Sequence, residues 1–136
     1  MGAYHPSETT ERVLGLDFSS VCCGWAIFDD GLLLTYGKFL QKGDGHGERM
    51  WNFHLWLRHM LEAWAPTQLV YEAPYAGPRR HAFSVLSRYA GTVQMTHFAC
   101  TNAEIPEANA VAAHMVKKLI GARKGKNHVR TRRLCS

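Results

Sequence analysis

The sequence predicts an α/β domain with a mixed sheet, in which three antiparallel strands come first and strands and helices alternate afterwards. Short apolar runs occupy the first 40 residues and are separated by a strong turn signal, Asp29-Asp30-Gly31. Two later segments, residues 48–65 and a segment ending near Cys100, repeat apolar residues at helical spacing. This order of elements indicates a mixed sheet with helices packed on its faces.

The expected strands are short and apolar. Val13 to Leu16 carries no charge, which is typical of a strand buried on both faces of a sheet. The last expected strand is weakened by Pro106, because proline cannot donate a ladder hydrogen bond. The five strands are expected at residues 12–18, 24–28, 32–39, 69–72 and 103–105.

Each of the first two expected helices has one apolar face. In the first this face consists of Met50, Phe53, Leu57, Met60, Leu61 and Trp64, and Pro66 stops the helix. In the second it consists of Ala82, Val85, Leu86, Tyr89, Val93 and Thr96. Asn109 is expected to cap a last helix, which runs through Ile120 and ends at Gly121.

Length and composition indicate one globular domain. The chain has 136 residues, of which 46% are hydrophobic and 20% charged. No apolar run approaches the roughly 18 residues of a membrane span, so no membrane association is expected. The four cysteines form neither a CxxC motif nor a zinc spacing, which predicts reduced thiols in the cytoplasm.

Charge is distributed unevenly along the chain. Residues 1–114 hold 8 basic and 11 acidic residues, whereas residues 115–136 hold 8 basic residues and no acid. Such a segment faces phosphates or is a solvated arm. We expect a disordered segment at residues 1–11, one domain at 12–121 and a basic tail at 122–136.

Two acids close apolar strands and are the main candidates for a functional site. Asp17 ends the first strand and Glu72 ends the fourth, 55 positions later. Mg²⁺ prefers oxygen ligands and is often held by one or two carboxylates together with substrate phosphates. The acids alone fit equally well an interpretation in which Asp17 caps a turn and Glu72 pairs with an arginine.

Three motifs resemble those of RuvC-type Holliday-junction resolvases, in particular the small phage and bacterial RuvC-like nucleases. Residues 14–20, Leu-Gly-Leu-Asp-Phe-Ser-Ser, followed by Gly24-Trp25-Ala26, look like the first motif. Residues 70–74, Val-Tyr-Glu-Ala-Pro, are similar to the second motif, a strand-terminal glutamate before a mobile loop. Val116-Lys117-Lys118, with Gly121, Lys126 and Val129, resembles the basic segment before the family's final helix.

The resemblance covers roughly residues 12–129 and implies a ribonuclease H-like fold, a homodimer and Mg²⁺-dependent cleavage of branched DNA such as four-way junctions and forks, with Mn²⁺ as an alternative ion. It further implies that Asp17 and Glu72 are the catalytic metal ligands, in a bacterial or phage-infected cell.

Other residues are candidates for DNA contacts. Ser19 and Ser20 follow the first acid and either bind a phosphate or turn the chain. Tyr75, Arg79 and Arg80 follow Glu72, where an aromatic ring and cations suit distorted or single-stranded DNA. Lys117, Lys118 and Lys126 have no nearby acid in the sequence to neutralise them. These three lysines are therefore the best candidates for phosphate contacts.

One departure from the family leaves a second function open. The family completes its site with an acidic pair on a C-terminal helix, but the last acid here is Glu107, which suggests a truncation or a frame change. Glu104, Glu107 and His114 are poor substitutes. A DNA-binding module that does not cleave is therefore the alternative. An actin-like ATPase or sugar kinase is set aside, because it needs a second phosphate loop and a far longer chain.

Overall fold

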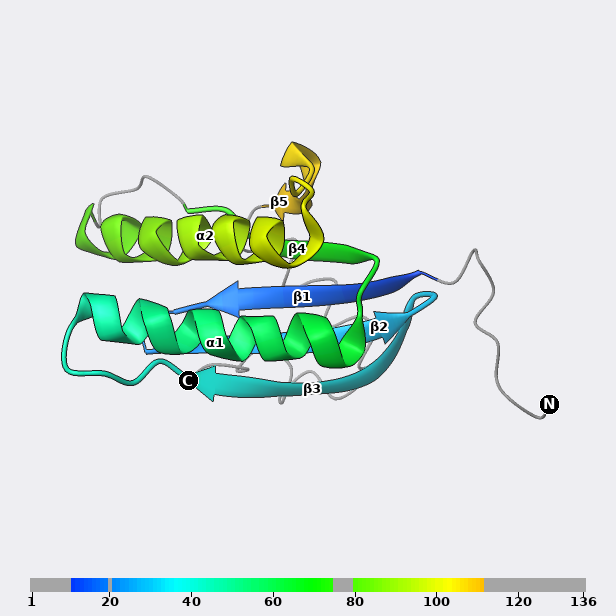
Figure 1. Cartoon of the computed structure of the whole chain (residues 1–136), viewed down its shortest axis with the longest axis horizontal. Coiled ribbons are helices and arrows are strands. Elements are labelled where there is room, and N and C mark those ends of the chain that lie inside the picture. Colours follow the sequence, from blue (N-terminus) through cyan, green and yellow to red (C-terminus); the bar gives the residue numbers. More distant parts are fainter. Residues whose placement is uncertain (1–10, 20, 75–79, 112–136) are drawn as a thin grey trace.

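The computed structural model describes residues 11–19, 21–74 and 80–111 (Figure 1). Within them the elements are β1 (Arg12–Phe18), β2 (Cys22–Asp29), β3 (Leu32–Leu40), α1 (His46–Trp64), β4 (Gln68–Glu72), α2 (Arg80–Thr101), the 3-10 turn η1 (Glu107–Asn109) and β5 (Ala110–Val111). The first four predicted strands and the first two predicted helices are confirmed, with bounds that differ by a few residues.

The described strands form one mixed sheet in the order β3-β2-β1-β4-β5. β2 runs antiparallel to both β1 and β3, whereas β4 is parallel to β1 and β5 is parallel to β4. The helices α1 and α2 lie side by side across one face of this sheet (Figure 1). The predicted mixed α/β sheet is therefore confirmed, and its parallel strands β1 and β4 end at the same edge.

The sheet has two faces with separate apolar clusters. On the face covered by α1 and α2, which we call the front face, the large core gathers buried side chains from both helices and from β1, β2 and β4, including Leu14, Leu16, Phe53 and Val93. The opposite face, which we call the rear face, carries a small cluster centred on Ala26 and Phe28. Successive side chains of a strand point to opposite faces, so β1 contributes Leu14 and Leu16 to the front core and Val13 to the rear cluster.

The turn between β2 and β3 has the geometry that its sequence predicts. Asp30 and Gly31 both have positive φ, 49° and 85°, as a tight hairpin turn requires. The register is nevertheless not continuous, because a bulge shifts the pairing between Ile27 and Phe28 of β2. Asp29 pairs with Leu32 at the turn, whereas Ile27 already pairs with Thr35.

Helix α1 ends where the sequence predicts. Ala65 adopts the left-handed conformation with φ of 48°, and its N–H donates to the carbonyl of Leu61 at 3.0 Å. Pro66 follows directly and cannot continue the helix.

The predicted fifth strand is wrong in position. Residues 103–105 form no strand, and β5 instead lies at Ala110–Val111, beyond Pro106. Asn109 does not cap a helix, because it ends η1 and its Nδ2 donates to Gln68 Oε1 at 2.9 Å and to the Leu69 carbonyl at 3.1 Å. These bonds hold the start of β5 against β4. The predicted last helix to Ile120 and the basic tail at 122–136 lie outside the described residues.

Cysteine chemistry differs in part from the prediction. Cys22 is disulfide-bonded, so the expectation of four reduced thiols is wrong for this residue. Cys23 and Cys100 are free thiols. Among residues 11–19, 21–74 and 80–111, no helix is both long and apolar enough to cross a membrane.

Candidate metal and nucleic-acid site

Asp17 and Glu72 lie at neighbouring positions on two parallel strands. The register of β1 and β4 pairs Val13 with Gln68 and, at its last step, Leu16 with Tyr71. One position further along both strands come Asp17 and Glu72. Because paired strands lie about 4.8 Å apart, the fold brings together two acids that are 55 residues apart in sequence.

Both acids face the rear of the sheet. Leu16 and Tyr71, which directly precede them, belong to the core on the front face. Since side chains alternate along a strand, Asp17 and Glu72 project to the opposite side. Asp17 is 7% exposed and Glu72 is partly buried.

The buried thiol of Cys23 lies within the electrostatic influence of both acids. Burial raises the pKa of the Cys23 thiol well above its ordinary value, and the negative charges of Asp17 and Glu72 raise it further. Both carboxylates therefore act on the same buried sulfur. The thiol stays protonated at neutral pH and is not a nucleophile, because reactivity requires the thiolate.

Two adjacent carboxylates suit a cation that is shared with a substrate. Among residues 11–19, 21–74 and 80–111, no group of three or more His, Cys, Asp and Glu side chains could hold a metal ion. Mg²⁺, however, commonly takes only one or two protein carboxylates and completes its shell with waters and phosphate oxygens. The pair fits such an ion better than one enclosed by protein ligands alone.

Ser19 takes part in the turn between β1 and β2. Its Oγ accepts hydrogen bonds from the backbone N–H groups of Cys22 at 3.1 Å and Val21 at 3.3 Å, and donates to the Cys22 carbonyl at 3.2 Å. These bonds match the interpretation that the hydroxyl turns the chain. A phosphate contact by Ser19 stays a prediction.

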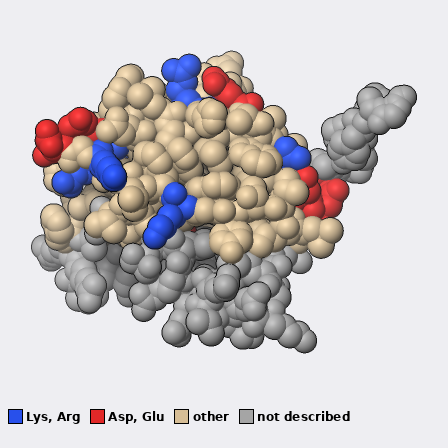
Figure 2. All heavy atoms as spheres, turned by 90° about the horizontal axis from the view of Figure 1, so that it is seen from below, with Lys and Arg blue, Asp and Glu red and all other residues tan. Residues whose placement is uncertain are grey.

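Most of the other predicted DNA contacts fall outside the described residues. This holds for Ser20, Tyr75, Arg79, Lys117, Lys118 and Lys126. Arg80 is the first residue of α2, at the end of the sheet where Glu72 lies, but its side chain is not described. On the face shown in Figure 2 the described lysines and arginines are dispersed among uncharged residues and form no continuous basic patch.

One basic residue that the sequence did not indicate, Lys38, lies in line with the two acids across the sheet. Asp17 pairs with Gly24 of β2, and Gly24 pairs with Lys38 of β3. We call Lys38, Gly24, Asp17 and Glu72 the transverse row. A continuous register from the hairpin turn, where Asp29 pairs with Leu32, would pair Gly24 with Gly37. The bulge shifts the pairing by one residue, so that Gly24 pairs with Lys38 instead.

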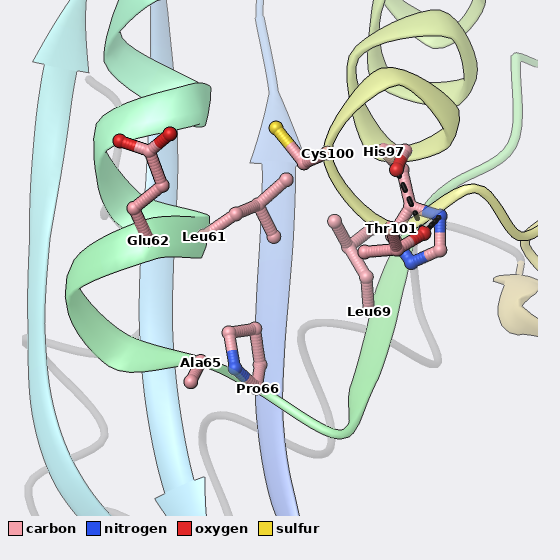
Figure 3. Close-up of a pocket in the computed structure, with 8 residues that line it drawn as sticks. All are labelled: Leu61, Glu62, Ala65, Pro66, Leu69, His97, Cys100 and Thr101. Carbon is pink, nitrogen blue, oxygen red and sulfur yellow. Dashed lines mark hydrogen bonds between the residues drawn. The ribbon is translucent and has the colours of Figure 1, made fainter.

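A cavity of about 290 Å³ lies at the other end of the sheet and is unrelated to the acids. It is enclosed by the end of α1, the start of β4 and the end of α2, with Leu61, Pro66, Leu69 and Cys100 among its lining residues (Figure 3). Glu62 pairs weakly with Arg58 at 3.8 Å. In Figure 3 its carboxylate points away from Leu69.

Comparison with known proteins identifies the fold. No protein-family model and no curated protein sequence matches the chain. The structure of Thermus thermophilus RuvC in complex with a Holliday junction substrate is similar, with a TM-score of 0.65 and 15% identity over 84% of this chain and 72% of that chain. A second Thermus thermophilus RuvC structure gives a TM-score of 0.63 and 15% identity over 87% and 75%. The chain thus has a RuvC-like, ribonuclease H-like α/β fold.

Proposed function

We propose that this chain is a metal-dependent, structure-selective DNA endonuclease that hydrolyses phosphodiester bonds in four-way junctions or other branched DNA, in the cytoplasm of a bacterial or phage-infected cell. The observation that carries the proposal is the position of Asp17 and Glu72, each one residue beyond the last pair, Leu16 with Tyr71, of adjacent parallel strands in a RuvC-like fold. The similar structure that holds a Holliday junction substrate supports branched DNA as the substrate class.

The two acids have distinct positions in the proposed site. Asp17 lies in the sheet interior between β2 and β4 and is buried, so that its carboxylate is held firmly. Glu72 is the last residue of β4 and is less buried. Each would offer oxygen ligands to Mg²⁺, or to Mn²⁺ in its place. When bound, the ion supplies positive charge that polarises the phosphate and lowers the pKa of a water.

Like charges at this spacing favour a bound cation for a physical reason. Two carboxylates on adjacent strands repel each other, and a cation between them removes that repulsion. A DNA phosphate brings further negative charge to the same place, so that the cation becomes more strongly favoured when DNA is bound. We therefore propose that metal and DNA bind the site together more tightly than either binds alone.

The basic residues beyond 111 belong to the proposal as phosphate contacts. Lys117, Lys118 and Lys126 would neutralise DNA phosphates without reading sequence. Replacing each with alanine should reduce the slope of log affinity against log salt by about 0.9. An unchanged slope would mean that the segment is a solvated arm. We further propose that the chain acts as a homodimer, which light scattering of the purified chain tests.

A second candidate function is a branched-DNA-binding module that does not cleave. It is favoured by one observation, namely that the sequence contains no acidic residue after Glu107. A site that clamps two metal ions needs more carboxylates than Asp17 and Glu72 provide. The polypeptide of these 136 residues is therefore expected to bind branched DNA, to cleave it slowly and to hold Mg²⁺ weakly.

The decisive experiment measures binding and cleavage of a labelled four-way junction in parallel, with Mg²⁺ and with Mn²⁺. Asp17→Asn should abolish metal-dependent cleavage and leave junction affinity measured without metal within about twofold, because it removes a ligand charge without changing shape. Glu62→Gln is the matched control, since this exposed acid lies at the other end of the molecule. Equal loss of binding and cleavage in Asp17→Asn would assign that residue a structural role.

The wild-type chain distinguishes the two functions. Junction binding without any metal-dependent cleavage would favour the binding module. Rapid cleavage with Mg²⁺ would show that other acids complete the site, and Glu104 and Glu107 would then be the first to test. If the wild-type chain cleaves slowly, addition of a C-terminal helix with the acidic pair of RuvC-type resolvases should raise its cleavage rate.

A further inference from the structure

Lys38 occupies the transverse row with the two acids. Gly24 pairs with Asp17 on one side and with Lys38 on the other, so the three positions lie in one line across the sheet. The next residue of β3, Phe39, packs against the front core. Since side chains alternate, Lys38 projects to the rear face, the same face as Asp17 and Glu72.

No side chain of β2 separates Lys38 from Asp17 within the transverse row. β2 contributes Gly24 to the row, and glycine has no side chain to stand between the lysine and the acid. Two strand spacings separate the backbones of β3 and β1, or about 10 Å. The four-carbon stem of a lysine can carry its ammonium across part of that distance. The reach of the side chain therefore allows the ammonium to approach the acids without contacting them.

The charge of Lys38 is available within the described part of the chain. Lys38 is exposed, and neither of the two salt bridges there involves it. Lysine also occurs on edge strands because its charge discourages pairing with other sheets, and β3 is an edge strand. A charge that only prevents aggregation could stand at any position along the edge strand. The register instead places the charge of Lys38 in line with Asp17 and Glu72.

We infer that Lys38 is a phosphate-binding residue of the site, which contacts a DNA phosphate next to the one held at Asp17 and Glu72. The inference rests on the proposed function and adds to the proposed site a phosphate-binding position on β3. The ammonium is a compact charge with three donors, which suits a phosphate oxygen. Placed two strands away from the acids, it attracts the DNA strand without competing for the cation. It is a positioning residue, not a group that moves a proton.

The test compares Lys38→Ala with Lys42→Ala in binding to a four-way junction across a salt series. Both variants lose one positive charge, and Lys42 follows the same strand but lines a hollow between β3 and α1 with Leu55 and Trp56. Lys38→Ala should reduce the slope of log affinity against log salt by about 0.9, whereas Lys42→Ala should leave it unchanged. Lys38→Arg should retain the wild-type slope, because the charge is kept.

The same comparison in an Asp17→Asn background separates two roles of the charge. A phosphate contact predicts the same slope loss in both backgrounds. If Lys38 only offsets the charge of Asp17, its removal has no effect once Asp17 is neutral, and the inference is overturned. Equal slopes for Lys38→Ala and Lys42→Ala overturn it as well. Binding without cleavage by the wild-type chain contradicts the endonuclease proposal alone, and absence of DNA binding contradicts both.

Discussion

At its amino end β1 places Arg12 between Asp29 and Trp64, and at its carboxyl end it places Asp17 beside Glu72. The first arrangement matches opposite charges. Arg12 donates from Nε and Nη2 to the two carboxylate oxygens of Asp29 at 2.6 and 2.9 Å, and from Nη1 to the Trp64 carbonyl at 2.9 Å. Its guanidinium also lies 5.7 Å from the centre of a Trp64 ring. This end of the strand joins β1, β2 and the end of α1.

At the carboxyl end of β1, Asp17 and Glu72 place like charges next to each other. This difference between the two ends of β1 indicates that they have different roles. Bidentate bonds to a carboxylate are among the stronger hydrogen bonds of proteins, so the Arg12 end contributes to stability. Two adjacent carboxylates contribute no such attraction to each other. Like-charge pairs of this kind occur frequently at functional sites. The carboxyl end is therefore the end where a ligand is expected.

The largest expected effect concerns metal binding at the carboxyl end. Asp17→Asn combined with Glu72→Gln should abolish binding of Mn²⁺ measured by titration calorimetry in the presence of a junction. Cleavage should fall by more than the roughly 10–100-fold typical of residues that only support a metal ligand. The melting temperature of the double variant without metal, compared with that of the wild type, is the control for folding. Retained Mn²⁺ affinity would place the metal elsewhere.

A smaller effect is expected at the amino end, on stability alone. Arg12→Ala removes the three side-chain hydrogen bonds that Arg12 makes to Asp29 and Trp64, and should lower the free energy of unfolding by about 1–3 kcal/mol in urea titrations. Arg58→Ala is the control, because its exposed pair with Glu62 at 3.8 Å contributes less than about 0.5 kcal/mol. Cleavage per folded molecule should be unchanged in both. A loss of cleavage in Arg12→Ala would contradict the division of roles between the two ends.

The smallest effect is the pH dependence of the Arg12–Asp29 pair. The hydrogen bonds from Arg12 lower the pKa of Asp29 below its ordinary value. A carboxyl with a lowered pKa in the folded state stabilises the protein fully above the unfolded pKa, about 3.9, and loses that contribution as the pH falls through the folded pKa. The stability difference between wild type and Asp29→Asn should therefore be constant above about pH 5 and shrink below pH 4. Urea titrations at several pH values measure it, and a difference that grows on acidification would be inconsistent with this pair.

Local sequence determined most of the strands and helices of the described residues and identified the two acids. The apolar runs of β1 and β4, the hairpin signal at Asp30-Gly31 and the helical spacing of α1 and α2 all act over a few residues, and each was predicted close to its observed bounds. The two acids were identified in the same way, because a carboxylate that closes an apolar strand is visible in the sequence itself. Their position beside each other then followed from the parallel pairing of β1 with β4.

Only the tertiary structure decided the features that depend on pairing between distant segments. β5 consists of two residues, Ala110 and Val111, whose strand character comes from their pairing with Tyr71 and Glu72. No local pattern predicts so short a strand. Lys38 depends on the bulge in the β2–β3 pairing, because side chains alternate with a period of two. One extra residue moved it from the front face, where the turn alone would have put it, to the rear face with Asp17.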